Sequence, residues 1–334
     1  MTTGDPPLVL GVDAGNSKTV AVVADLTGRV LGFGRAGNGD IYGAVTEQAA
    51  VDAVISAADA AMTAAYGRAD HSRLGHAAFC LAGMDWVSDH EFWTAQLDDR
   101  YPGLSRTLHN DGFALLRAGE PGGLGVALSV GTGGAVVARG PEREWTASFW
   151  LRDPLGGGEL GRAAFDAVVR ADLGIDPATC LTQILLTHLG HDDVSAMLEA
   201  GTRRGGHLPA YAGLARDVLD AARRGDEVAA RIVLGQARSL ARYARAACAR
   251  VGLDDTATTV VLGGSVLSSE NPGLRDATVA ALAEELPGAR AVLSPRSPVV
   301  GAALEAIAEL RGSVPADVVD RVTAHQFPPT FLLT

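Results

Sequence analysis

The stretch Leu8-Val-Leu-Gly-Val-Asp-Ala-Gly-Asn-Ser-Lys-Thr-Val-Ala-Val-Val23 indicates how the rest of the chain is organised. Apolar residues fill positions 8–12 and 20–23 on either side of a short turn, a pattern that predicts a β-hairpin. Backbone N–H groups that converge at the tip of such a hairpin bind anions, and Ser17 and Lys18 add a hydroxyl group and a positive charge. The tip therefore predicts a phosphate site made of Gly15, Asn16, Ser17 and Lys18.

Lys18 is the only lysine in the chain, and the other strongly basic residues are all arginines. This bias suggests that the function of the tip requires a compact ammonium group. A plain hairpin turn with a chance lysine is the alternative explanation. Two other nucleotide motifs are excluded locally. A P-loop has glycine directly before its lysine, where this chain has Ser17, and a dinucleotide fingerprint continues into a helix, whereas residues 19–24 predict a strand.

The composition is typical of a soluble chain with two cores. Its 334 residues, of which 47% are hydrophobic, suffice for two domains, and the net charge of −11 argues against broad nucleic-acid binding. Cys80, Cys180 and Cys248 are too widely separated to suggest a disulfide framework or a closed metal site. Because no apolar run is long enough to span a membrane and residues 1–7 do not resemble a signal peptide, we expect a cytoplasmic protein.

The first half of the chain alternates between strands and helices. We expect strands at 29–33, 76–81 and 106–109 and helices at 43–66 and 88–100. In the loop at 34–42, Asn38 and Asp40 can donate and accept toward a polyhydroxylated ligand, or they serve ordinary Asn-Gly turn chemistry. Asp111 follows a strand at the edge where open α/β sheets bind ligands, so it is a candidate general base, or else it caps the helix at 112–118.

The second half repeats the opening theme. After a break at 119–123, strands at 124–130 and 135–138 flank a second glycine turn, Gly131-Thr-Gly-Gly134. In a duplicated fold the two turns would face one cleft and grip the phosphates of a nucleotide from opposite sides. A further strand at 258–262 runs into Gly263-Gly-Ser265, where the glycines let a flat ring such as adenine approach the backbone, or simply form a tight turn.

Helices dominate the remainder. We expect residues 145–158 to be irregular and helices to cover 159–173, 177–189, 192–200, 208–224, 226–251 and 271–286. A short strand at 289–293 precedes a helix at 298–310, for which Ser297 is a suitable cap and Pro298 a suitable first residue. The tail at 312–334 has no clear pattern. His188 and His191 lie three residues apart, but the Leu-Gly between them suggests a helix end more than a metal site.

Several short motifs, taken in order, resemble those of the sugar-kinase, actin and heat-shock-protein ATPase superfamily. Within it the chain is most similar to the N-acetylglucosamine kinase-like proteins, which are grouped with the benzoyl-CoA reductase activator ATPases. The motifs are Gly11-Val-Asp-Ala-Gly-Asn-Ser-Lys-Thr19, Asn38, Leu81-Ala-Gly-Met-Asp85, Asn110-Asp111, Ser129-Val-Gly-Thr-Gly133, Ala222-Arg-Arg-Gly-Asp226, Val261-Leu-Gly-Gly-Ser265 and Ser297-Pro-Val-Val-Gly-Ala302. Together they extend from about residue 8 to residue 310.

The resemblance implies an α/β protein with the duplicated ribonuclease H-like fold of actin-like ATPases. Each of its two domains would contain a mixed five-stranded sheet flanked by helices, and the domains would close over ATP and a small sugar substrate. The expected divisions are an N-terminal domain at 1–113, a C-terminal domain at 114–297 with a helical insertion, a helix at 298–311 that packs back on the first domain, and a tail at 312–334. The relatives also suggest a homodimer.

The resemblance also implies roles for individual residues. Asp13 would hold Mg²⁺ through water. The ATP-binding residues would be Gly15, Asn16, Ser17, Lys18, Gly131, Thr132, Gly133, Ala222, Gly263, Gly264, Ser265 and Ser268, of which Ala222, Gly264 and Ser268 would line the adenosine pocket. The substrate-binding residues would be Asn38, Asp40, Asp111, Thr132, Gly133, Asp153 and Glu159, with Asp111 as the catalytic base.

One segment departs from the kinase pattern. In the kinases a Gly-Trp-Gly stretch leads to Gly-Asp-Glu-Gly-Ser, whose aspartate contacts the sugar. Here the region is Phe149-Trp-Leu-Arg-Asp-Pro-Leu-Gly-Gly-Gly-Glu159, and Asp153 and Glu159 are the two candidates to replace that aspartate. The activator ATPases are disfavoured, because they hold an iron–sulfur cluster between subunits with cysteines, and the cysteines here are not arranged in that way.

We therefore expect an ATP-dependent kinase that transfers the γ-phosphate to a hydroxyl, the 6-hydroxyl, of an amino sugar such as N-acetylglucosamine or glucosamine. Two alternatives stay open. One is a nucleotide-dependent switch that lacks a sugar substrate. The other is a kinase of a different polyol such as a cyclitol, since specificity depends on a few contacts from loops.

Overall fold

The computed structural model describes residues 7–148, 155–204, 211–253 and 257–332. The strands are β1 (Leu8–Ala14), β2 (Thr19–Asp25), β3 (Val30–Ala36), β4 (Leu74–Leu81), β5 (Arg106–Asn110), β6 (Gly125–Val130), β7 (Gly134–Arg139), β8 (Glu144–Ala147), β9 (Thr259–Gly263) and β10 (Arg290–Leu293). The helices are α1 (Glu47–Tyr66), η1 (His71–Arg73), α2 (Val87–Arg100), α3 (Gly112–Gly119), α4 (Gly157–Asp172), α5 (Leu181–Leu189), α6 (Val194–Thr202), η2 (Tyr211–Leu214), α7 (Ala215–Arg223), α8 (Glu227–Val251), α9 (Gly273–Glu285), α10 (Pro298–Arg311), α11 (Ala316–Thr323) and α12 (Pro329–Leu332).

The strands form two mixed five-stranded sheets with the same connectivity. Their orders are β3-β2-β1-β4-β5 and β10-β9-β6-β7-β8. In the first sheet β1 pairs antiparallel with β2 and parallel with β4, and in the second β6 pairs antiparallel with β7 and parallel with β9. The predicted duplication is therefore confirmed, and each half opens with three antiparallel strands, followed by strands that pair in parallel.

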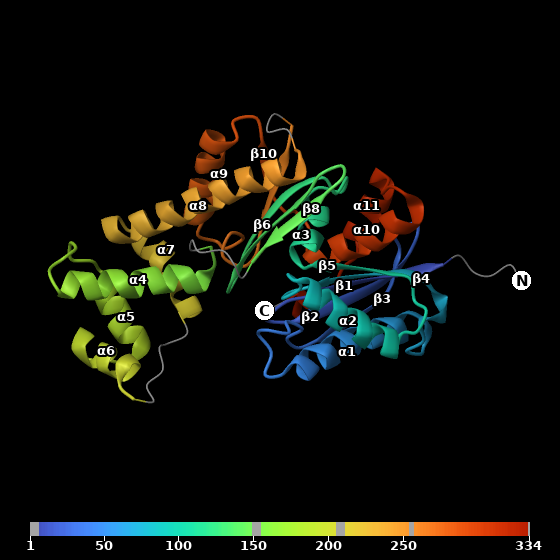
Figure 1. Ribbon diagram of the computed structural model, residues 1–334, viewed down its shortest axis with the longest axis horizontal. Coiled ribbons are helices and arrows are strands. Elements are labelled where there is room, and N and C mark those ends of the chain that lie inside the picture. Colours follow the sequence, from blue (N-terminus) through green and yellow to red (C-terminus); the bar gives the residue numbers. More distant parts are fainter. Residues whose placement is uncertain (1–6, 149–154, 205–210, 254–256, 333–334) are drawn as a thin grey trace, which may run out of the picture.

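Helices cover both faces of the first sheet, which explains why β1 is a continuous apolar run. Leu10 and Val12 face a core shared with α1 and α2, whereas Val9 belongs to a second core formed with α10 and α11. Figure 1 shows α3 and α10 together between the two sheets, with α4, α5 and α6 lying to one side. Gly301 allows α10 to cross α3 closely, because a Cβ there would lie 1.9 Å from the Ala114 carbonyl oxygen.

The structure corrects three expectations about local structure. The region at 145–158 contains β8, a four-residue edge strand that pairs with β7, so it is not wholly irregular. The tail contains α11 and α12, and Phe327 and Phe331 pack on Phe33 of β3. Ser297 occupies the N-cap position of α10, but its side chain makes no capping hydrogen bond.

Helices also cover both faces of the second sheet. The second sheet packs against α3 on one face, and the core on its other face includes residues of α4 and α8. Within the residues that the structure describes, none of the helices has the length and apolar character needed to cross a membrane.

Candidate functional site

The tip of the first hairpin is a tight turn. Gly15 N donates to Lys18 O at 2.9 Å, directly beyond the last pair of the ladder, Ala14 with Thr19. Asn16 and Ser17 are exposed and Lys18 is half-buried. The residues predicted to bind phosphate therefore lie on a short turn at the end of β1, which the Gly15–Lys18 hydrogen bond closes.

The loop after β3 is fastened to this turn by Asp40. Its Oδ2 accepts from Asn16 Nδ2 at 2.9 Å, and its Oδ1 accepts from Tyr42 N at 2.9 Å. Asn38 Oδ1 accepts from the Asp40 N–H at 2.8 Å, and the Asp40 side chain is only 7% exposed. The local contacts thus use Asp40 to shape the loop, while Asn38 keeps its partly exposed amide beside the turn.

Acidic side chains gather where the parallel strands of the first sheet end. Asp13 lies in β1, Asp85 follows β4 and Asp111 follows β5, and β4 is the neighbour of both other strands. Together with Asp40 we call these residues the carboxylate cluster. Burial, together with the negative charges of Asp13, Asp85 and Asp40, raises the pKa of Asp111 to about 7. Burial also raises the pKa of Asp13 to about 7 and that of Asp85 to about 6.

Asp111 occupies the N-cap position of α3 without capping it. Its side chain makes no capping hydrogen bond, and the Gly112 N–H donates to Asn110 Oδ1 at 3.0 Å. Asn110 also donates from Nδ2 to Asp85 Oδ1 at 3.2 Å. The neighbouring asparagine therefore organises the turn, which leaves the Asp111 carboxyl available for chemistry.

The second glycine turn is bound to the start of α4. Gly131 N donates to Gly133 O at 2.9 Å, and Gly157 N and Gly158 N donate to Gly131 O and Thr132 O at 2.8 and 3.0 Å. Thr132 and Gly133 are exposed at the tip. Glu159 lies in the first turn of α4 and pairs with Arg162 at 2.9 Å, and Asp153, the other candidate for sugar binding, lies outside the described residues.

The third glycine turn lies beside the second. Gly263 ends β9, and Gly264 has a φ of +87°, where a side chain would also bring Cβ within 2.5 Å of the Val130 backbone. Val266 N donates to Val130 O at 2.9 Å, and Ser265 Oγ lies 3.7 Å from the place of a Cβ on Gly131. Gly131 and the turn after β9 thus form one continuous surface.

A cavity of about 1040 Å³ opens from this surface. Its lining residues are His188, Ala212, Gly213, Ala215, Arg216, Asp217, Leu219, Asp220, Arg223, Ser265, Val266, Ser268, Ser269, Glu270 and Asn271. Ser268 was predicted to line the adenosine pocket and Ser265 to bind ATP, and both line this cavity; Gly264, also predicted for the adenosine pocket, is not among its lining residues. Ala222 packs against the hydrophobic core and is not a lining residue, although its α7 neighbours Leu219, Asp220 and Arg223 are.

Asp13 is the residue that fits a magnesium ion bound through water. Across the ranges that the structure describes, no three His, Cys, Asp or Glu side chains are arranged to hold a metal ion by themselves. The raised pKa of Asp13 means that the negative charge of this half-buried carboxylate lacks sufficient compensation, although the Lys18 charge lowers that pKa. A cation beside Asp13 would supply the missing compensation, with phosphate oxygens and water completing its coordination.

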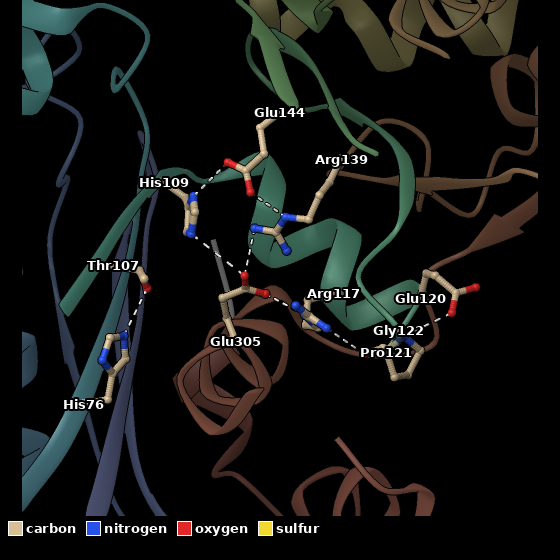
Figure 2. A network of polar contacts seen from close by, with 10 residues as sticks. All are labelled: His76, Thr107, His109, Arg117, Glu120, Pro121, Gly122, Arg139, Glu144 and Glu305. Atoms are coloured by element: carbon tan, nitrogen blue, oxygen red, sulfur yellow. Dashed lines mark hydrogen bonds and ion pairs between the residues drawn. The ribbon is translucent and has the colours of Figure 1, made fainter. Parts of the chain in front are cut away.

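A second cluster of charged side chains connects the two halves of the chain, as Figure 2 shows. Glu305 of α10 pairs with Arg117 of α3 at 2.5 Å and with Arg139 of β7 at 2.7 Å. Glu144 of β8 pairs with Arg139 at 2.5 Å and with His109 of β5 at 3.3 Å. We call these five residues the Glu305 cluster. Burial opposes ionisation of Glu305, which is 2% exposed, but the Arg139 and Arg117 charges lower its pKa below the usual value.

Two features near the site were not among the predicted functional residues. Asp85 could have been recognised, because it follows a buried strand as Asp111 does. The second feature has no signal in the sequence: Lys18 Nζ donates to the Leu332 carbonyl at 2.5 Å, and Arg35 Nη1 donates to the carbonyls of Phe331, at 3.0 Å, and Thr330. Burial lowers the pKa of Lys18.

Comparisons with known proteins identify the family of the chain. The sequence profile of the BadF/BadG/BcrA/BcrD ATPase family matches residues 10–306. The glucosamine kinase GspK of Vibrio cholerae serotype O1 is 24% identical over 188 residues, which span 55% of this chain and 62% of that relative.

Solved structures show the same fold. A Chromobacterium violaceum protein provisionally called an N-acetylglucosamine kinase is 24% identical, with a TM-score of 0.68 over 90% of this chain and 98% of that one. A ROK family glucokinase from Streptomyces griseus, solved with glucose and AMPPNP, is 20% identical, with a TM-score of 0.54 over 91% of this chain and 98% of that one.

Proposed function

Because the chain belongs to the BadF/BadG/BcrA/BcrD ATPase family, we propose that it is an ATP-dependent kinase with an amino sugar as its acceptor. The observation that carries this proposal is the Asp111 carboxyl, which is half-buried at the end of β5 and makes no capping hydrogen bond to α3. A nucleotide switch has no need of such a group. A kinase needs it to accept the proton of an alcohol.

Asp111 acts as the general base. A sugar hydroxyl is a poor nucleophile, and a carboxylate that takes up its proton during attack contributes about 10² to 10⁴ in rate. The raised pKa of Asp111, about 7, brings its basicity near the operating pH, where proton transfer is most effective.

The glycine turns and their charged residues hold the nucleotide. Lys18 and Ser17 contact the phosphates from the first half, and Thr132 and Gly133 contact them from the second. Asp13 would hold Mg²⁺, which supplies neutralisation of the phosphate charge during transfer. The adenosine would occupy the cavity that begins at Ser265 and continues along α7.

The acceptor we propose is glucosamine or N-acetylglucosamine, phosphorylated at the 6-hydroxyl. Asn38 and Asp111 would contact it, and Glu159 and Asp153 are the further candidates. We also propose that the unit of 1–113 with 298–311 closes against the unit of 114–297, because closure excludes water from the phosphate during transfer. The homodimer and the cytoplasmic location stay predictions.

The test is ADP release from Mg-ATP by the purified protein, measured against hexoses, hexosamines, N-acetylhexosamines and cyclitols. A reaction without acceptor is the control, and mass spectrometry identifies the phosphorylated product. We expect a hexosamine or N-acetylhexosamine to raise turnover well above the control and to gain one phosphate.

Other outcomes would replace the proposal. Stimulation by a cyclitol alone would move the acceptor to a different polyol class. Binding of ATP without stimulation by any acceptor would favour the nucleotide-dependent switch, and the segment at 150–159 would then be the first place to look for a lost sugar site.

A further inference from the structure

A second cavity, of about 510 Å³, lies between the start of α2 and the edge strand β8. Its lining residues are Met84, Asp85, Trp86, Val87, His90, Glu91, Leu108, His109, Asn110, Phe113, Glu144, Trp145 and Thr146. This volume falls in the usual range of small-molecule pockets, about 300 to 1,000 Å³. Within the described part of the chain, it shares no lining residue with the cavity that we assign to the nucleotide, so the two are separate sites.

The cavity is continuous with the carboxylate cluster. Asp85 and Asn110 line it, and they are joined by the 3.2 Å hydrogen bond between Asn110 Nδ2 and Asp85 Oδ1. Asp111 is the next residue along the chain, and the Asp85 charge contributes to raising its pKa. A molecule with its reacting hydroxyl at Asp111 can therefore extend past Asp85 into this cavity.

Among the described residues, the lining contains three carboxyl groups and no lysine or arginine, although Glu144 pairs with Arg139 just outside the lining. Asp85, Glu91 and Glu144 contribute carboxyl groups, and the other titratable lining residues are His90 and His109. Burial opposes ionisation of Glu144, but a hydrogen bond from His109 and the charge of Arg139 hold its pKa at about 2, so it stays ionised at neutral pH. This electrostatic environment favours a cationic ligand.

Apolar side chains line the same cavity. Trp86 is 49% exposed and the adjacent Val87 is 78% exposed, at the start of α2, while Phe113 is buried. Large exposed apolar groups beside a pocket are typical of ligand contacts. The face of a tryptophan binds the apolar face of a sugar ring and attracts a nearby ammonium group.

Building on the proposed kinase function, we propose that this cavity binds a second, amine-bearing ring of the acceptor. The substrate class is an aminated saccharide of at least two rings. Its phosphorylated ring lies at Asp111, and the protonated amine of its next ring lies between Trp86 and Glu91. A free monosaccharide would make no contacts with the residues that line this cavity, so it would bind more weakly than the disaccharide.

Calorimetry without ATP tests this binding apart from catalysis. The probes are the β-1,4-linked disaccharide of glucosamine, its N,N′-diacetylated form, and glucosamine itself. We expect the diamine to bind at least about tenfold more tightly than either other probe, because one cation held against an aromatic face and a carboxylate supplies about that factor.

Two variants locate the binding. Trp86→Ala and Glu91→Gln should each weaken binding of the diamine about tenfold and change glucosamine binding less than about twofold. Asp99→Asn is the matched control, because this exposed carboxylate lies on the same helix and does not line the cavity. We expect it to bind all three probes as the unmodified protein does.

The outcomes separate this proposal from the kinase function. Tight binding of the diamine with no phosphorylated acceptor supports the cavity assignment and removes the kinase function. Phosphorylation of glucosamine with no preference for the diamine overturns the cavity assignment. Analytical ultracentrifugation gives a second way to overturn the cavity assignment. If Trp86→Ala halves the mass of the sedimenting species and leaves the affinities for all three probes unchanged, the exposed residues belong to a contact between copies of the chain.

Discussion

The carboxylate cluster and the Glu305 cluster are both rich in acidic groups, and burial raises the pKa in both, yet the net pKa shifts of the two clusters have opposite signs. Glu305 and Glu144 have guanidinium and imidazole partners, and the pKa of each lies below its usual value. Asp13, Asp85 and Asp111 have fewer compensating charges, and their pKa values are raised to about 6 or 7.

This contrast separates structure from chemistry. A buried charge with matched partners is stable as it stands and joins the elements that supply those partners. A buried carboxyl without them destabilises the fold when ionised, so it is retained where a cation or a transferable proton will meet it. The Glu305 cluster therefore connects the two halves, and we propose that the carboxylate cluster serves the reaction.

The largest expected effect is on turnover. Asp111→Asn keeps the size of the side chain but removes the base, so sugar-dependent ADP release should fall about 10²- to 10⁴-fold. Calorimetry should show unchanged binding of Mg-ATP. If the variant keeps full sugar-dependent turnover, the carboxylate cluster loses its catalytic role and the contrast with the Glu305 cluster fails.

The converse change tests the Glu305 cluster through stability. Glu305→Gln leaves Arg117 buried without its carboxylate partner and Arg139 with Glu144 as its remaining one, which should lower the free energy of unfolding by about 3 to 5 kcal/mol. Urea denaturation measures the change. Asp98→Asn is the matched control: its partner is Arg106, but Asp98 itself is 58% exposed, so about 1 kcal/mol or less is expected. A loss for Glu305→Gln no larger than that of the control would contradict the structural role.

The pH dependence of turnover sharpens the contrast further. A base works only when unprotonated, and the Asp111 pKa of about 7 means that it is protonated below neutral pH. We expect kcat/KM for the acceptor to fall about tenfold for each pH unit below 7. Since the Asp13 charge helps to raise that pKa, saturating Mg²⁺ should move the fall to lower pH. A fall that begins only near pH 4 at every Mg²⁺ concentration would show that Asp111 is not the base.

We expect the smallest effect on turnover from a substitution of Asp40. Both oxygens of its carboxylate accept hydrogen bonds within the protein. Its hydrogen bonds to Asn16 and Tyr42 hold the loop after β3. Asp40→Asn keeps one acceptor oxygen, so we expect kcat to fall less than about tenfold, with a rise in KM for the acceptor. Steady-state kinetics would separate the two constants, and a loss of kcat as large as that of Asp111→Asn would place Asp40 in the chemistry.

Much of the fold could be predicted because its signals are local. The hairpin that carries Lys18 at its tip was predicted from two short apolar runs and the turn residues between them, all within a few positions. The edge strand β8 was missed because four residues that include Glu144 carry too little apolar pattern. The tail was missed because its helices are short and are stabilised by packing against Phe33, which is distant in the chain.

The site was predicted where one residue carries the signal, as Asp111 does. The Glu305 cluster was not, because Arg117 and Glu305 are separated by 188 positions and only the crossing of α3 and α10 brings them together. Asp85 was within the quoted motifs, but its raised pKa arises mainly from burial, which depends on the folded structure.

The contact between Lys18 and the Leu332 carbonyl has a practical consequence for anyone who purifies this protein. A purification tag or fluorescent protein fused after residue 334 would be tethered beside the first glycine turn, since two residues extend at most about 7 Å. Tags are therefore better placed at residue 1 for activity assays. Conversely, a small environment-sensitive dye attached at the end of the chain would report nucleotide arrival at Lys18 without any change to the turn itself.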